Sequence, residues 1–70
     1  MLSPRQREVA TLLAAGLINK EIGLVLQIGE RTVESHVEAI LRKLGFQRRT
    51  QIGRWAGERN LGTGGQPPYN

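Results

Sequence analysis

The side chains that could carry out chemistry are few in this chain of 70 residues. It has no cysteine and a single histidine, His36, which excludes a thiolate metal site and cannot build a zinc site alone. No serine, cysteine or aspartate accompanies His36 in a catalytic arrangement, so the histidine is expected to pack or to face a phosphate. We therefore expect no enzyme activity, no bound metal and no cofactor.

The basic residues offer a different chemistry, the binding of a polyanion. Ten Lys and Arg stand against six Asp and Glu, which gives a net charge of +4. A small basic domain often binds nucleic acid, although a charge of this size also serves solubility alone. Aromatic residues make up 4% of the chain, too few for a surface that stacks the bases of single strands.

The distribution of apolar residues bears on the localisation of the chain and on its domain organisation. No apolar run approaches the roughly 20 residues of a membrane span, and the N-terminus lacks the apolar segment of a signal peptide. We expect one cytoplasmic domain over residues 1–60, without membrane contact. Residues 61–70 are rich in Gly and Pro and have no apolar period, so a disordered tail is predicted there.

Four helices and no strand are predicted, so the fold class is all-α. The first helix covers about residues 4–15 and begins with clear signals. Ser3 and Gln6 are spaced as a capping box around Pro4, which suits the first helical position. Gly16 is placed to end the helix in a left-handed turn.

The strongest helical period lies at about residues 30–44. One side is apolar and predicted to be buried: Val33, Val37, Ile40, Leu41 and Leu44. The opposite side is polar: Arg31, Glu34, Ser35, Glu38 and Arg42. This second side is therefore expected to be free for a partner.

A shorter helix at about residues 19–26, with Asn19 as its available cap, precedes the periodic one. We expect Gly29 and its polar neighbours to form a tight turn between the two helices. Small Gly23 would let the helices approach closely, and Ile28 would fill the corner between them. This is the geometry of a helix-turn-helix, but an ordinary corner in a helical bundle would show the same periodicity.

The last helix is predicted at about residues 49–60. Its apolar side carries four residues: Ile52, Trp55, Ala56 and Arg59. Gly53 and Gly57 each cost about 1 kcal/mol of helix stability relative to alanine. This helix is therefore expected to be weak unless it packs against another element.

Three blocks of sequence decide between the alternatives: LSPRQREV at the start, NKEI in the second helix and RTVESHVEAILRKLG around the third. In this spacing the chain resembles the LuxR-type helix-turn-helix domain of bacterial transcription regulators, over about residues 2–58. The resemblance implies that residues 30–44 form the recognition helix in the major groove of duplex DNA. It also implies a weak homodimer on an inverted repeat, with RNA polymerase as a further candidate partner.

The resemblance also implies roles for individual residues. Base contacts are expected on the outer face of the third helix: Glu34, Ser35 and Glu38. Phosphate contacts are expected mainly near helix N-termini: Asn19, Lys20, Arg31, Thr32, His36, Lys43, Arg48, Arg49 and Thr50. For Arg49 an ion pair with Glu8 or Glu21 is an alternative. The dimer interface is expected in the fourth helix: Ile52, Trp55, Ala56 and Arg59.

Several positions depart from the family pattern, among them Gln6, Gly53 and Gly57, and three of them bear on the function. Ile18 stands where Ser or Thr usually caps the second helix, so the cap passes to Asn19 or is lost. Glu34 and Glu38 stand where basic or amide residues are common. These carboxylates repel phosphates, accept a hydrogen bond from cytosine N4, or contact neither. A second hypothesis is therefore a helix-turn-helix used as a protein-interaction module with weakened DNA binding.

Overall fold

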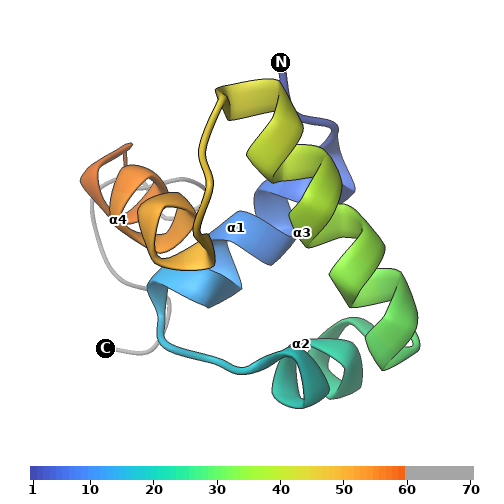
Figure 1. Cartoon of the computed structure of the whole chain (residues 1–70). Coiled ribbons are helices and arrows are strands. Elements are labelled where there is room, and N and C mark those ends of the chain that lie inside the picture. Colours follow the sequence, from blue (N-terminus) through green and yellow to red (C-terminus); the bar gives the residue numbers. More distant parts are fainter. Residues whose placement is uncertain (60–70) are drawn as a thin grey trace.

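The computed structural model describes residues 1–59, and in them four helices follow one another without a strand (Figure 1). They are α1 (Pro4–Ala14), α2 (Asn19–Leu26), α3 (Glu30–Leu44) and α4 (Arg49–Arg59). The predicted all-α class is confirmed. The tail predicted at residues 61–70 lies outside the described residues.

Helix α1 is the centre of the arrangement. It contacts each of the other three helices, and its contact with α4 is the most extensive in the domain. Helix α3 crosses in front of α1 in Figure 1, and α2 lies beneath it at the end where α3 begins. Helices α2 and α3 thus meet at a corner, and α1 contacts both of them.

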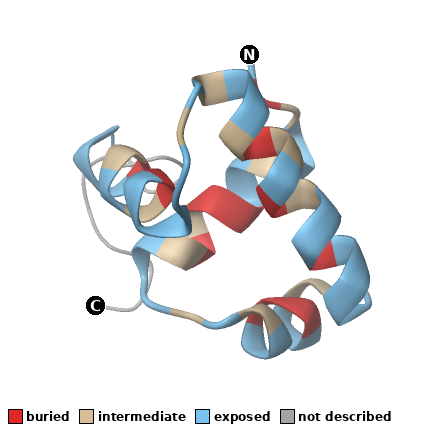
Figure 2. Ribbon diagram, viewed as in Figure 1, coloured by how far each residue is buried: buried red, intermediate tan, exposed pale blue. Residues whose placement is uncertain are grey.

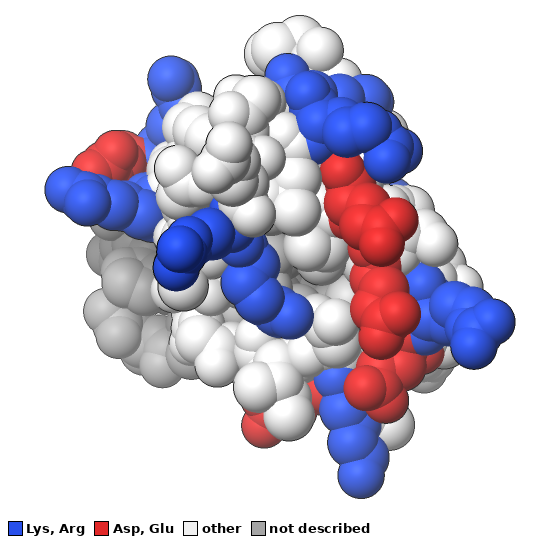
Figure 3. Space-filling view, viewed as in Figure 1, with Lys and Arg blue, Asp and Glu red and all other residues white. Residues whose placement is uncertain are grey.

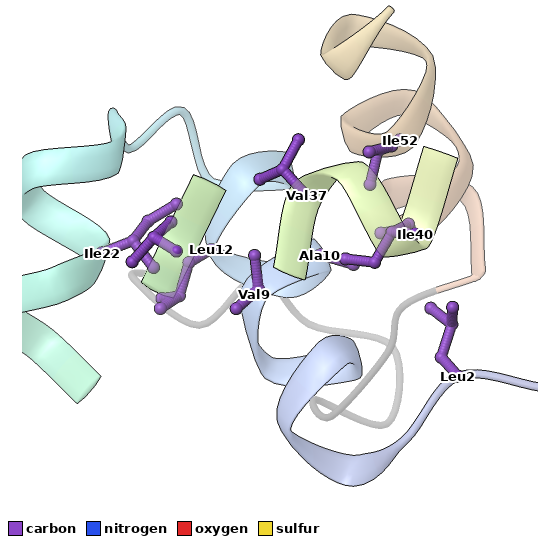
Figure 4. Close-up of a cluster of buried hydrophobic side chains, with 10 residues drawn as sticks. Leu2, Val9, Ala10, Leu12, Ile22, Val37, Ile40 and Ile52 are labelled. Atoms are coloured by element: carbon purple, nitrogen blue, oxygen red, sulfur yellow. The ribbon is translucent and has the colours of Figure 1, made fainter. Parts of the chain in front are cut away.

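A single hydrophobic core holds the four helices together. The largest fully buried side chains are branched and come from every helix: Val9, Ile22, Val33, Ile40 and Ile52 (Figure 4). The predicted apolar side of α3 faces this core, while its outer side is exposed (Figure 2). The orientation of α3 is therefore fixed by buried branched side chains, which have few alternative rotamers.

Helix α1 begins and ends as its sequence predicts. The Ser3 hydroxyl accepts a hydrogen bond from the Gln6 N–H at 3.1 Å, and the Gln6 side chain accepts one from the Ser3 N–H at 2.9 Å. At the other end Gly16 has a φ of +92°. Its N–H donates to the Leu13 carbonyl, and the Leu17 N–H donates to the Leu12 carbonyl, which is the Schellman pattern.

Of the two alternatives for the start of α2, a cap by Asn19 or the loss of the side-chain cap, the structure shows the second. Ile18 occupies the cap position and has no side-chain cap, and Asn19 is the first helical residue. The Asn19 Oδ1 is buried and makes no hydrogen bond within residues 1–59. One of the two hydrogen bonds of a capping box is still present, because the Glu21 carboxylate accepts from the Ile18 N–H at 2.9 Å.

The turn between α2 and α3 depends on two residues. Gln27, not Gly29, adopts the left-handed conformation, with φ 58° and ψ 44°, while Gly29 has an ordinary φ of −70°. Gly23 is required for a different reason, because a Cβ there would lie 2.8 Å from the Ile28 carbonyl oxygen. The prediction that Gly23 allows close approach is confirmed, and Ile28 packs against the core as expected.

The two glycines of α4 play different parts. A Cβ on Gly53 would lie 3.3 Å from the Leu13 carbonyl oxygen, so this glycine lets α4 pack closely on α1. A Cβ on Gly57 would make an ordinary contact with Ala14 at 3.8 Å. Only Gly53 therefore has a packing reason to be glycine.

Candidate nucleic-acid interface

The outer side of α3 is the surface that the sequence predicts to contact base edges. Glu34, Ser35 and Glu38 are all exposed there, while Val33 and Val37 on the opposite side are buried. The buried residues fix the rotation of the helix about its axis. They therefore also fix which side chains point outward.

The acidic residues of α3 extend further than the sequence reasoning noticed. Glu30, the first residue of the helix, precedes Glu34 and Glu38 at the same spacing of four, so the three form one line, here called the acidic row. Figure 3 shows this acidic band along α3, with basic side chains above and beside it. The repeat of four is visible in the sequence, but Glu30 was not among the predicted base contacts.

The acidic row is free of ion pairs within residues 1–59. The two ion pairs of this part of the chain join Arg5 to Glu8 at 3.2 Å and Arg54 to Glu58 at 3.5 Å, on α1 and α4. The carboxylates of the row are therefore available to an external hydrogen-bond donor.

Most of the predicted phosphate contacts lie on the surface at the starts of helices. The exposed ones at helix starts are Lys20, Arg31, Thr32, Arg48, Arg49 and Thr50, and Lys43 is exposed near the end of α3. Asn19 and His36 are half-buried. Backbone N–H groups at a helix N-terminus attract anions, so these positions suit phosphate binding.

The segment that leads into α2 and the start of α4 border the same hollow. An open hollow of about 470 Å³ is lined by Ile18, which precedes α2, and by Arg49 and Thr50 at the start of α4. Gln51 supports the α4 end, since its side chain accepts from the N–H groups of Gln47 and Arg48 at 2.8 and 2.9 Å. Sequence reasoning missed Gln51, although an amide three residues after a helix cap is a known signal.

The structure adds detail for two of the predicted cationic residues, and their phosphate contacts stay predictions. The Lys43 ammonium donates to the Gln6 side chain at 2.9 Å and to the Met1 carbonyl at 3.3 Å, so it ties α3 to the start of the chain. The alternative ion pair of Arg49 with Glu8 or Glu21 is not formed: within residues 1–59, Glu8 pairs with Arg5, and Glu21 accepts from the Ile18 N–H. Arg49 is left exposed for another partner.

The predicted dimer interface stays a prediction, and two of its four residues are buried within this chain. Ile52 and Ala56 are buried in the core of the chain itself, with 0% and 2% exposure, so they have no surface to offer a second copy. Trp55 is half-buried, and the Arg59 guanidinium lies over its ring, 5.1 Å from the centroid. Trp55 and Arg59 remain the candidates.

The described residues form neither a metal site nor a membrane span. No group of three His, Cys, Asp or Glu in the described part of the chain is placed to hold a metal ion. None of the helices α1 to α4 combines the length and the apolar character needed to cross a membrane.

The arrangement matches a known family. Residues 1–56 match the family of bacterial regulatory proteins described as the luxR family. This chain belongs to the LuxR family. Its relatives include transcription regulators, and the family consists of DNA-binding regulators rather than enzymes.

The LuxR-family relatives are much longer than this chain. It is 54% identical over 50 residues to YhjB of Escherichia coli (strain K12), assigned as an HTH-type transcriptional regulator, covering 71% of this chain and 25% of that protein. It is 37% identical over 60 residues to the nitrate/nitrite response regulator NarL of the same strain, covering 86% and 28%. It is 43% identical over 61 residues to the response regulator VraR of Staphylococcus aureus (strain Mu3), covering 87% and 29%. The chain thus spans about a quarter of the length of these relatives.

Proposed function

We propose that this chain binds duplex DNA in a sequence-specific manner, as the effector domain of a bacterial transcription regulator. In this proposal α3 enters the major groove, and Glu34, Ser35 and Glu38 face base edges. A dimer places two such helices on an inverted repeat. The domain acts in the cytoplasm, and RNA polymerase is a further partner.

The observation that carries the proposal is the exposed polar side of α3. A helix fits the major groove of B-DNA, and this one presents its polar side outward because its apolar side is buried on α1 and α2. Exposed Arg31, Lys20 and Arg49 lie at or near the starts of α3, α2 and α4. They supply the phosphate contacts that provide most of the affinity.

A second candidate function is a protein-interaction module, and the acidic row favours it. Carboxylates along a reading helix oppose binding to a polyanion, and they suit a basic protein surface. Leu24 and Val25 of α2 are also unusually exposed, at 72% and 53%, which suits a protein partner. The net charge of +4 and the exposed cations at the helix starts favour DNA instead.

Titration against duplex DNA separates the two functions. We expect a labelled duplex of random sequence to bind at low ionic strength, with log K falling by about 0.9 per contacted phosphate for each unit of log salt. Lys20→Ala and Arg49→Ala should each remove about one phosphate contact and so reduce the magnitude of that slope by about 0.9. Arg5→Ala removes the same charge from α1, where Arg5 pairs with Glu8, and serves as the matched control.

Two results would contradict the DNA-binding function or its assigned phosphate contacts. If wild-type protein fails to bind duplex at low salt, or binds with no dependence on salt, the protein-interaction function is favoured. If all three arginine and lysine variants reduce the slope equally, binding depends on net charge alone, and the assignment of phosphate contacts to the helix starts is wrong.

A further inference from the structure

We propose that α3 selects cytosine, through hydrogen bonds from cytosine N4 to the carboxylates of Glu34 and Glu38. This inference rests on the proposed DNA-binding function and specifies the sequences that the function would select. According to this inference, the two glutamates determine base specificity and are not merely surface charges.

The first step of the argument is the division of charge on the binding surface. The exposed cations Lys20, Arg31 and Arg49 lie at or near helix starts, where backbone N–H groups also favour phosphate. Glu34 and Glu38 lie further along α3, on the exposed part of its surface, and no cation of residues 1–59 pairs with them. When α3 occupies the major groove, its exposed side in the N-terminal half and middle of the helix faces base edges, and the phosphates flank the groove.

The second step concerns hydrogen bonding. An ionised carboxylate only accepts, and the major groove offers two kinds of donor, cytosine N4 and adenine N6. In an A·T pair the donor is flanked by acceptors on both sides, adenine N7 and thymine O4, which repel a carboxylate. In a C·G pair an acceptor flanks the donor on one side only. Cytosine is therefore the base that two unpaired glutamates favour.

The third step is the spacing of the two carboxylates. Residues four apart on a helix are separated by about 6 Å along its axis, and successive bases on one strand by about 3.4 Å. A helix lying along the groove therefore places Glu34 and Glu38 about two base steps apart. Each half-site should show two cytosine preferences with roughly that separation.

Selection from a random pool tests this inference. The full chain is incubated at low salt with duplexes that carry a randomised central segment of about ten base pairs, and the bound duplexes are sequenced. Wild-type protein should enrich cytosine at two positions. Glu34→Gln should shift one position toward adenine and Glu38→Gln the other, since an amide pairs with adenine N6 and N7. The ratio of cytosine to adenine at the affected position should fall about 5- to 150-fold, the size of one good base contact.

A control separates base recognition from charge. Glu58→Gln changes the net charge by the same amount on α4, at an exposed pair with Arg54, and should leave the base preferences unchanged. If both α3 variants keep the wild-type preferences, or if wild-type protein binds the pool without enriching cytosine, the cytosine inference is wrong and the DNA-binding function stands. If wild-type protein retains no duplex at low salt, the proposed function fails, and the inference fails with it. All three substituted residues are exposed, so an unchanged helical circular dichroism spectrum confirms that the variants fold.

Discussion

Single residues decide how closely the two helices of the motif approach. The clearest case is Gly23, whose missing side chain leaves room for the Ile28 carbonyl oxygen. The clash that a Cβ would cause is with backbone, and backbone of a tight turn cannot move aside as a flexible side chain can. The geometry of the helix-turn-helix therefore depends on the absence of a side chain at position 23.

We expect Gly23→Ala to lower the free energy of unfolding by about 1–3 kcal/mol, the usual cost of overpacking. Alanine is the better helix former, so any loss is steric and outweighs the gain in propensity. Thermal or urea unfolding followed by circular dichroism measures the change. Unchanged or raised stability would show that the turn relaxes, and that the close approach seen here is not required.

Gln27 shows what residue types cannot reveal. The sequence places a glycine two positions later, and glycine is the usual left-handed residue, yet Gly29 is extended and Gln27 is left-handed. The turn geometry is set by where α2 and α3 must dock, and that information is spread over the core. Local preference therefore identified the turn but not the residue that bends it.

At the scale of the helix, α4 depends on packing more than on its own sequence. Gly53 lies against the Leu13 carbonyl, while Gly57 has ordinary room next to Ala14. The two positions are four residues apart in one helix and have the same intrinsic cost. They therefore form a matched pair for separating propensity from packing.

We expect Gly57→Ala to raise the free energy of unfolding by about 0.5–1 kcal/mol, because alanine gains the helix propensity without a clash. Gly53→Ala should gain clearly less or should destabilise, because its Cβ presses on backbone 3.3 Å away. Urea unfolding of the two variants side by side measures the difference. Equal gains at both positions would mean that α4 moves freely on α1.

The helices were predictable from sequence where their signals are short-range. The capping box at Ser3 and the glycine stop at Gly16 involve neighbours in the chain, and both were confirmed. The role of Ile52 was not predictable in the same way. An apolar side shows that a helix packs against something, but not whether the partner is another helix of the same chain or a second copy. In this structure α4 packs on α1, and Ile52 lies in the core.

The candidate interface was predictable only in part, for a related reason. The outer position of Glu34 and Glu38 follows from the period of α3, and the structure places both on the surface. The contact of Lys43 with Gln6 joins residues 37 positions apart, so no local pattern could indicate it. Long-range contacts of this kind depend on how α1 and α3 cross.

For the whole molecule, the burial of Ile52 and Ala56 leaves little apolar surface on α4 for a second copy. We expect the isolated chain to sediment as a monomer in dilute solution and to pair mainly on DNA with two half-sites. A tight dimer without DNA would contradict this expectation. If such a dimer survives Trp55→Ala unchanged, its interface also lies elsewhere than the exposed edge of α4.

The place of α2 has a consequence for how the domain opens. This helix has eight residues, no side-chain cap at Ile18, and exposed Leu24 and Val25, so few contacts oppose its local unfolding. Its backbone amides should exchange with solvent deuterium sooner than those of α1 and α4, whose mutual contact is the most extensive. Yet α2 supports the start of α3. When α3 binds DNA, the backbone amides of α2 should therefore exchange more slowly with solvent deuterium, even where they contact no nucleotide.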